Sequence, residues 1–310
     1  MTVVVAGGTG LAGSAIVRAF EDAGHKVIGL NRTVVDLLDR DATLAYLKKV
    51  KPSLVVDAAA KVGGIGANNT LPVEFLMDNV RIQSNLMEAA HAADVERFIF
   101  LGSSCIYPRD CAQPIKEEYL LTGPLEQTNS AYAIAKIAGI ELIKSYRKEY
   151  QRKWISLMPT NLYGPRDNFD LQQAHVLPAL IRRFVEAKRN GVDTVTLWGT
   201  GSPRREFLHV DDLARAVVLA SEKYDATDHI NIGTGEDLTI RELAELIARL
   251  AGFTGTIAWD SSKPDGTPRK VLDVTKVKSL GWSPQISLES GIASTIAWFE
   301  TASAKGEARL

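Results

Sequence analysis

With 310 residues, of which 45% are hydrophobic, the chain is long enough to bury a sizeable core, and its length suits one large α/β unit with a smaller lobe. A formal net charge of -1 excludes a general attraction to nucleic acid or to an anionic membrane, and no apolar run of about 18 residues predicts a membrane span. Two cysteines without metal-ligand spacing predict neither a disulfide framework nor a metal site. Because the N-terminal apolar run leads into a glycine turn rather than a signal-peptide cleavage site, we expect a cytoplasmic protein.

The first predicted element is a strand at residues 2–6, buried on both faces, which leads through a glycine-rich turn at residues 7–13 into a helix. Gly7, Gly10 and Gly13 have the G-x-x-G-x-x-G spacing of a dinucleotide fingerprint in its strand-turn-helix context. Glycine lets the backbone approach a pyrophosphate, and the helix N-terminus favours its negative charge. This stretch predicts a Rossmann-type, doubly wound parallel sheet that binds a dinucleotide; a plain glycine turn is the alternative.

The second predicted strand, at residues 26–30, ends next to the residues that bear on cofactor choice. An acidic residue commonly stands there in sites that select against a 2′-phosphate, whereas this chain has Asn31 and Arg32. Because an arginine suits a phosphate, we expect NADPH/NADP+ as the cofactor. A solvated surface arginine is the alternative interpretation of Arg32.

Further strands and helices alternate until the pattern weakens near residue 166. The predicted elements are strands at residues 53–60, 97–101 and 154–158, a glycine-rich loop at 61–69, a helix at 75–93, a surface loop at 110–128 and a helix that contains Tyr132. We therefore place a cofactor-binding domain at residues 1–165, with residues 206–235 returning to it. Residues 166–205 and 236–310 are expected to form a smaller, discontinuous α/β substrate lobe.

The expected chemical centre lies between Leu101 and Lys136. Ser103 and Cys105 follow a predicted buried strand, where a site can open at the sheet edge. Tyr132 and Lys136 are four residues apart in a run of helix formers, so their side chains share one face. An ammonium group near a phenol is expected to lower the pKa of the tyrosine, which makes it a usable proton donor. Alone, such a pair is more often surface decoration, but the glycine turn strengthens the catalytic interpretation.

Together, the glycine turn, Ser103 and the Tyr132-x-x-x-Lys136 pair resemble the extended short-chain dehydrogenase/reductase superfamily. Within it, the chain is similar over nearly its whole length to the GDP-4-keto-6-deoxy-D-mannose 3,5-epimerase/4-reductases. The most specific segments are residues 58–70, 101–108, 132–140, 158–165, 205–212 and 263–270. The resemblance implies inversion at C3 and C5 of a GDP-linked 4-keto sugar and then reduction of its C4 ketone by NADPH.

A ketone at C4 acidifies the hydrogens at C3 and C5, so this chemistry needs a base and an acid on opposite sides of the sugar ring. By the resemblance, Cys105 is the base and His175 the acid, and both residue types suit proton transfer at neutral pH. Tyr132, helped by Lys136 and Ser103, would stabilise the enolate and then protonate the C4 oxygen. A buried filler role for Cys105 and a capping or surface role for His175 are the alternatives.

The resemblance also implies the ligand contacts. The expected cofactor contacts are Gly7, Gly10, Leu11, Gly13, Arg32, Lys136 and Asn161, and the expected substrate contacts are Arg183, Trp198, Arg205 and, as a weaker candidate, Asp265. Core packing is the alternative for Trp198. Thr9 stands where the family's glycine turn can carry an arginine, so Arg32 would hold a 2′-phosphate with less help.

Two other functions share these features. A nucleotide-sugar 4-epimerase, 4,6-dehydratase or reductase of the same superfamily would have the same fold, although a 4-epimerase needs no base at C3 or C5. A non-catalytic NADP(H) sensor would have no need for the proton donor Tyr132. A homodimer is expected from the family, with helices at residues 75–93 and 131–150 as a possible interface, but an apolar helix face serves an internal core equally well.

Overall fold

A six-stranded, all-parallel sheet forms the centre of the larger part of this computed structural model, which describes residues 1–263 and 265–310. Its strand order is β10-β5-β4-β3-β1-β2. The strands are β1 (Thr2–Ala6), β2 (Lys26–Leu30), β3 (Leu54–Asp57), β4 (Arg97–Leu101), β5 (Ile155–Pro159) and β10 (Ile230–Ile232). The predicted Rossmann-type fold class is confirmed.

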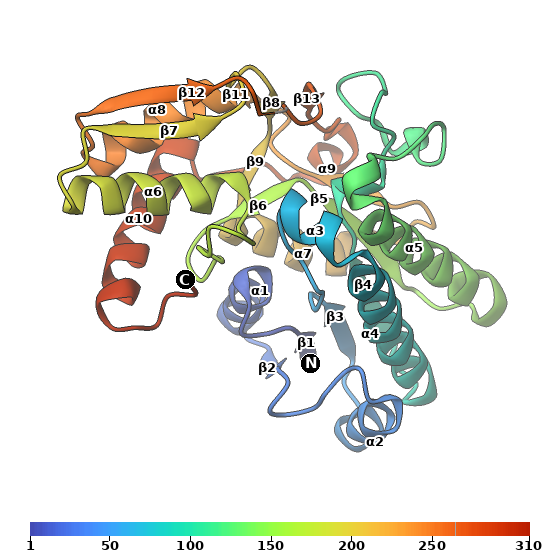
Figure 1. The fold of residues 1–310 in the computed structure, drawn as a ribbon. Helices are drawn as coiled ribbons and strands as arrows, with labels where there is room; N and C mark the ends of the chain where they lie inside the picture. The colour runs from blue at the N-terminus through green and yellow to red at the C-terminus, as the bar shows by residue number, and fades with distance from the viewer. Residues whose placement is uncertain (264) are drawn as a thin grey trace.

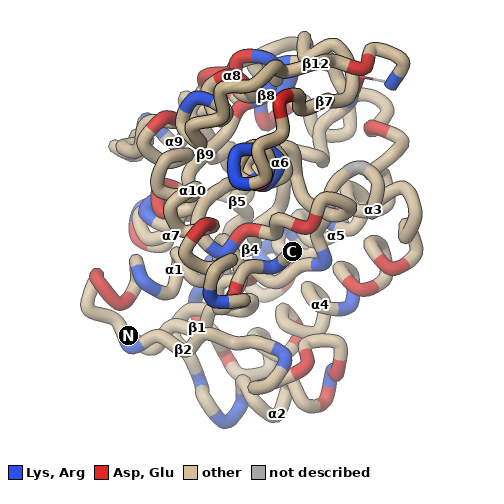
Figure 2. The backbone as a smooth tube through the Cα atoms, turned by 60° about the vertical axis from the view of Figure 1, so that its left-hand side comes forward, with Lys and Arg blue, Asp and Glu red and all other residues tan. Residues whose placement is uncertain are grey.

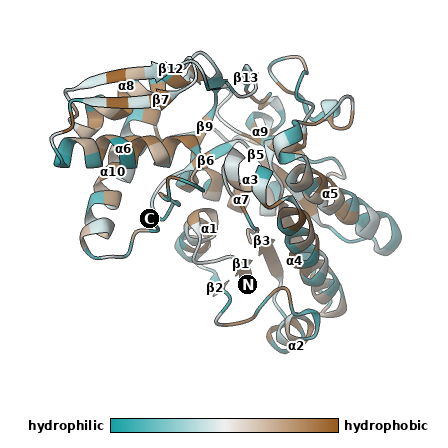
Figure 3. Ribbon diagram, in the orientation of Figure 1, coloured by the Kyte–Doolittle hydropathy of each residue, from teal (hydrophilic) through white to brown (hydrophobic). Residues whose placement is uncertain are grey.

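Helices cover both faces of this sheet, which explains why its central strands are apolar on both sides (Figures 1 and 3). On one face α4 (Pro72–Ala92) packs between α2 (Arg40–Val50) and α5 (Ser130–Tyr150). On the other face α1 (Leu11–Asp22) packs against α7 (Val210–Lys223).

Most predicted elements of this part are confirmed, and two differ for identifiable reasons. The strand expected at residues 53–60 ends at Asp57, because the chain leaves the sheet there. The loop expected at residues 61–69 contains a short helix, α3 (Ile65–Thr70). The side-chain amide of Asn68 donates to the carbonyl oxygens of Gly63 and Gly64, which ties the first turn of this helix together.

A second hydrophobic cluster forms the smaller part of the molecule. It joins α6 (Val176–Arg189), α8 (Ile240–Ala251) and α10 (Leu288–Ala304) to the parallel pair β7 (Thr194–Trp198) and β12 (Thr256–Asp260). In Figure 1 these elements lie together at the upper left. The domain boundaries expected from the sequence stay a prediction.

Short strands connect the two clusters. The parallel pair β6 (Asn161–Tyr163) and β9 (Phe207–His209) follows β5, and β8 (Arg204–Arg205) lies between β11 (Leu238–Thr239) and β13 (Arg269–Lys270). After β13, Leu272 and Val274 and then α9 (Thr275–Ser279) pack with the larger cluster. The chain therefore crosses between the two clusters several times.

The chain has 36 Lys and Arg and 37 Asp and Glu residues. In the view of Figure 2, basic and acidic residues are interspersed along most of the backbone. Within the described ranges, no helix is both long enough and apolar enough to cross a membrane.

The glycine turn after β1 is closed by backbone contacts, which gives a first prediction. A Cβ atom at Gly13 would lie 2.1 Å from the carbonyl oxygen of Gly7, whereas one at Gly10 would meet only that oxygen, at 3.3 Å. Gly13→Ala is expected to lower the free energy of unfolding by about 1–3 kcal/mol, because the helix must move away from the strand. Urea unfolding without cofactor measures this change. Gly10→Ala is the matched control, and equal losses in both variants would contradict the packing argument.

Candidate active site

The carboxyl ends of the parallel strands place the glycine turn, the serine segment and the start of β6 at one edge of the sheet. In the turn, Gly7 has a φ of 73°, and the amide of Gly8 donates to the carbonyl oxygen of Leu30 at 2.8 Å. The turn leads into α1, whose first residue is Leu11. The little-obstructed backbone at Gly10 and the N-terminus of a twelve-residue helix together fit a pyrophosphate.

Two further expected cofactor contacts border this edge. Arg32 is exposed directly after β2, in a turn that the side chain of Asn31 organises by accepting from the amides of Thr33 and Val34. An exposed guanidinium at the end of β2 fits the expected 2′-phosphate contact. Asn161 begins β6, and its Nδ2 donates to the carbonyl oxygen of Glu206 at 2.8 Å.

Ser103 and Cys105 form a compact turn immediately after β4. The hydroxyl oxygen of Ser103 accepts from the amide of Cys105 at 3.2 Å and so caps a 3-10 turn (η1, Ser104–Ile106). The half-buried Cys105 thiol receives a second contact from Nδ2 of Asn129, at 3.5 Å from Sγ. Asn129 therefore orients the sulfur atom from the start of α5.

Tyr132 and Lys136 share one face of α5, as predicted, but the expected effect on the pKa of the tyrosine is wrong. Burial raises the pKa of Tyr132, with a further increase from Cys105 and an opposing effect of the Ser103 hydroxyl. Nζ of Lys136 lies 5.9 Å from the centre of the Tyr132 ring and donates instead to the carbonyl oxygen of Leu101 at 2.9 Å. Lys136 is itself buried, and burial lowers its pKa. Desolvation thus outweighs the attraction of the ammonium group for a phenolate.

The expected acid, His175, stands at the N-cap of α6 and is held through the chain that precedes it. The amide of Gly64 donates to the carbonyl oxygen of Gln173 at 2.7 Å, and a Cβ atom at Gly64 would lie 2.6 Å from the carbonyl oxygen of Ala174. His175 keeps contact with solvent, yet the surrounding protein desolvates the imidazole enough to lower its pKa.

Helix α3 connects the two expected proton-transfer residues. Its N-cap, Gly64, binds the segment before His175, and the helix also packs against the 3-10 turn η3 (Gln127–Asn129), whose last residue contacts Cys105. The fold thus supports the base side and the acid side of the site from one short helix.

The expected substrate contacts fall into two groups. Burial lowers the pKa of Arg205. Cys105 and Glu126 are close enough to raise it, but their effect is smaller. Nη1 of Arg205 donates to the carbonyl oxygens of Arg204 and Thr267. Arg205 therefore lies near the serine edge, which it connects to the polar loop at residues 263–270.

The second group lies at the end of β7. Trp198 is 70% exposed, so core packing does not explain it, and Nζ of Lys263 lies 5.8 Å from its ring. Nη1 of Arg183 reaches the carbonyl oxygen of Thr196 on the same strand. Asp265 accepts from the amide and the hydroxyl of Thr200, so its carboxylate already organises the turn after Trp198.

Two residues that shape the site were not singled out by the sequence analysis. Gly64 was considered only as part of the glycine-rich loop at residues 61–69, and Asn129 lies just after the surface loop expected at residues 110–128. An Asn directly before a helix is a typical N-cap, but this side chain contacts the cysteine instead of capping the helix. Both contacts bridge distant segments, which no local pattern reveals.

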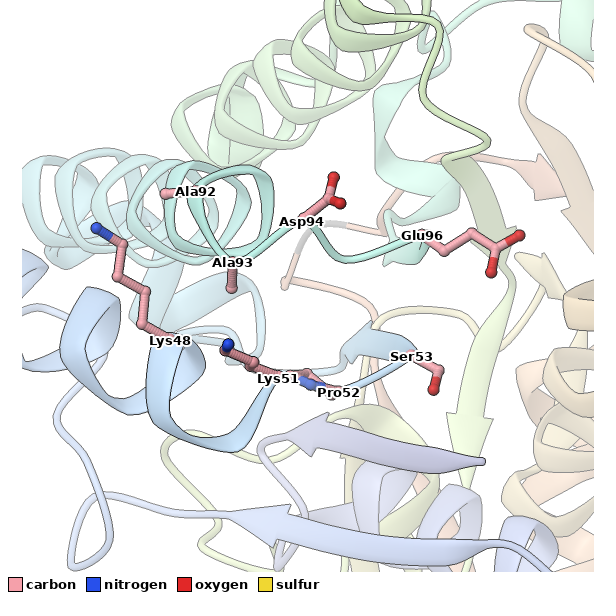
Figure 4. Close-up of a pocket in the computed structure, with 8 residues that line it drawn as sticks. All are labelled: Lys48, Lys51, Pro52, Ser53, Ala92, Ala93, Asp94 and Glu96. Atoms are coloured by element: carbon pink, nitrogen blue, oxygen red, sulfur yellow. The ribbon is translucent and has the colours of Figure 1, made fainter.

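Open recesses elsewhere do not coincide with this chemistry. The recess in Figure 4 has a volume of about 700 Å³ and lies at the opposite edge of the sheet, where Ser53 and Glu96 precede β3 and β4. Its lining mixes Lys48 and Lys51 with Asp94 and Glu96. Across the described residues, no group of three or more His, Cys, Asp or Glu side chains is arranged to hold a metal ion.

Comparison with known proteins finds one matching family and relatives of similar length. The model of the NAD dependent epimerase/dehydratase family matches residues 3–233. GDP-L-fucose synthase of Escherichia coli K12 is 52% identical over 307 residues, which cover 96% of this chain and 96% of that protein. GDP-L-fucose synthase 1 of Arabidopsis thaliana is 52% identical over 298 residues, covering 96% of this chain and 92% of the relative.

Solved structures agree with this relationship. A GDP-L-fucose synthetase from Naegleria fowleri bound to NADP superposes with a TM-score of 0.92 at 30% identity and covers 100% of this chain and 96% of that one. A GDP-mannoheptose C4 reductase from Campylobacter jejuni with NADP bound has a TM-score of 0.89 at 33% identity, covering 96% and 98% of the two chains.

The contact between Gly64 and Gln173 gives a second prediction. In Gly64→Ala the added methyl group must push the 172–174 segment away, because the carbonyl oxygen of Ala174 stands 2.6 Å from its position. We expect hydrogen exchange in the peptide around residues 170–176 to become at least about tenfold faster. This corresponds to a decrease of about 1.4 kcal/mol in the free energy of local opening. Gly66→Ala is the control, because its Cβ would meet only the carbonyl oxygen of Gln172, at 3.7 Å. Unchanged protection in Gly64→Ala would contradict the assignment.

Proposed function

The chain belongs to the NAD dependent epimerase/dehydratase family, and we propose that within it the protein converts GDP-4-keto-6-deoxy-D-mannose to GDP-L-fucose. The reaction is inversion at C3 and C5 of the sugar, followed by reduction of the C4 ketone. The observation that carries the proposal is a thiol and an imidazole supported by one helix, α3, at the edge that also holds the Ser103, Tyr132 and Lys136 side chains.

NADPH/NADP+ is the cofactor, in keeping with the NADP-bound structural neighbours. When bound, NADPH supplies the hydride that reduces C4. In this chain the turn at Gly7, Gly10 and Gly13 would receive its pyrophosphate, and Arg32 would bind the 2′-phosphate. Lys136 would hold the nicotinamide ribose.

Cys105 acts as the base that removes a proton next to the ketone. Its sulfur atom is half-buried and oriented by the Asn129 amide, so it can be aimed at a carbon of the sugar ring. Ser103 donates to the C4 oxygen while negative charge develops on the enolate. The same hydroxyl lies close enough to Tyr132 to lower the pKa of that phenol, which supports a shared role for the two groups at the C4 oxygen.

His175 acts as the acid on the other side of the ring, with solvent access that allows its proton to be replaced. Tyr132 then protonates the C4 oxygen in the reduction. Because burial raises the pKa of Tyr132, the phenol is protonated at neutral pH and ready to donate.

The substrate's diphosphate and base are assigned to the smaller lobe. Arg183 and Arg205 suit the phosphates, and the exposed ring of Trp198 can pack against the base or a ribose. Asp265 contributes by holding the turn that follows Trp198. The domain division proposed from the sequence, residues 1–165 with 206–235 against 166–205 with 236–310, separates these contacts from those of the cofactor.

A homodimer in the cytoplasm completes the proposal. Val73 and Met77 on α4 and Ile134 on α5 are exposed apolar side chains on two helices that pack side by side. Such a surface suits a second copy of the same helices. Two free, half-buried cysteines suit a reducing compartment.

The proposed reaction is tested with purified protein, NADPH and GDP-4-keto-6-deoxy-D-mannose in deuterated water. NADPH oxidation together with deuterium at both C3 and C5, followed by NMR, is the expected result. Reduction without deuterium at these carbons would identify a C4 reductase instead, which the likeness to the Campylobacter reductase makes the second candidate. If neither NADPH oxidation nor deuterium exchange is observed, the proposal is refuted.

The base is tested with Cys105→Ser. Exchange at the sugar ring is expected to fall by about 10²–10⁴-fold, the usual range for loss of a general base, while NADPH binding is retained. Cys111→Ser is the matched control, because the proposal gives the second cysteine no role. Unchanged exchange in Cys105→Ser would remove this residue from the mechanism.

The dimer is tested by light scattering after size-exclusion chromatography. The unmodified protein is expected to have twice the mass of one chain, and Met77→Asp with Ile134→Asp is expected to have the mass of one, because two charges are placed in an apolar interface. Val192→Asp serves as the control, because it changes an exposed apolar residue just after α6, away from α4 and α5. A monomeric unmodified protein would contradict the proposal.

A further inference from the structure

The side-chain carboxylate of Asp57 is buried at the end of β3, and the proposed reaction gives it no role. Asp57 has no exposed surface and pairs in register with Phe100 on the neighbouring strand β4. Its Oδ1 accepts from the amide of Ala59 at 3.2 Å, whereas Oδ2 finds no hydrogen-bond partner in the part of the chain that the structure describes. A buried carboxylate with an unsatisfied oxygen is costly and calls for a nearby positive charge.

The nearby positive charge is Lys136. Its Nζ donates to the carbonyl oxygen of Leu101, the residue that follows Phe100, and lies 4.7 Å from the centre of the Phe100 ring. Asp57 and Lys136 thus lie on either side of the same residue pair, Phe100 and Leu101, at the end of the β3–β4 pair, close enough for their charges to act on each other. Lys136 is as deeply buried as its neighbours in the core, so it too needs a counter-charge to stay protonated.

The charges in this cluster act on one another in both directions. Burial raises the pKa of Asp57 to about 6, and Lys136 opposes that rise. Burial lowers the pKa of Lys136, and Asp57 opposes that fall. The other groups that face the pair are Tyr132, on which Asp57 acts directly, and the Cys105 thiol, which acts on Tyr132.

We propose that Asp57 is a positioning residue for the reduction, whose carboxylate keeps Lys136 protonated inside the protein. This inference rests on the proposed function, in which Lys136 binds the ribose of the cofactor next to Tyr132. Lys136 does so in its protonated, charged form. Because Asp57 has no exposed surface, it acts only through Lys136. Its removal leaves Lys136 to lose its proton at a lower pH.

Removal of the Asp57 carboxylate is expected to make the ammonium group of Lys136 easier to deprotonate. A carboxylate favours the charged form of a lysine, so Asp57→Asn lowers the pKa of Lys136 and moves the alkaline limit of any property that needs the ammonium group to lower pH. We expect that limit to move by about one pH unit or more, a tenfold change in the protonation equilibrium. Both the affinity for NADP+ and kcat/KM for NADPH oxidation should show this shift.

The primary experiment measures the dissociation constant of NADP+ against pH by calorimetry, which needs no sugar substrate. Asp57→Asn is compared with the unmodified protein and with Asp167→Asn. Asp167 is a second buried carboxylate, whose pKa burial raises to about 7, but it does not act on Lys136. An alkaline limit shifted only in Asp57→Asn supports the proposal, and an unshifted limit overturns it.

A second measurement covers the case in which Asp57→Asn folds poorly. Lys136→Met should lower the melting temperature by leaving Asp57 without its counter-charge, and adding Asp57→Asn to that variant should restore part of the loss. Absence of such rescue would refute the pairing. Because neither measurement uses the sugar, failure of the deuterium assay would leave the Asp57 result standing, and the two proposals can fail independently.

Discussion

All strands of the central sheet run in the same direction, and this single constraint places the chemistry. Each strand must return through a helix to the starting edge, so the residues that follow β1, β3, β4 and β5 all collect at the carboxyl edge. The glycine turn, Asp57, Ser103 and Asn161 come from four separate stretches of chain and meet there for that reason alone. The segment that precedes His175 is joined to this edge by the hydrogen bond between Gly64, which follows β3, and Gln173.

Much of this arrangement could be predicted because it depends on local sequence. The spacing of Gly7, Gly10 and Gly13 after an apolar strand determines the turn, and the four-residue spacing of Tyr132 and Lys136 determines their shared helix face. The strand bounds at residues 2–6, 26–30 and 97–101 were predicted as the structure has them, since each strand ends where its run of apolar residues ends. The roles of the site residues stay proposals that these placements support.

What could not be predicted depends on contacts between distant segments. The pKa of Tyr132 was expected to be lowered but is raised, because the sequence shows the spacing of Tyr132 and Lys136 but not how deeply the fold buries them. The short helix α3 was expected as a loop, since its stability comes from contacts with the segments around residues 127–129 and 172–174. The exposure of Trp198 likewise depends on which surface the smaller cluster leaves uncovered.

The contact between Gly13 and Gly7 also limits how this chain can change over evolutionary time. At Gly139 an added Cβ atom would meet the ring of Phe100, and a smaller residue at position 100 could make room for it. At Gly13 the obstacle is a backbone carbonyl group, which every amino acid at position 7 retains. A second substitution can therefore make room directly for a side chain at position 139, whereas at position 13 it can only offset the cost of moving the helix away from the strand.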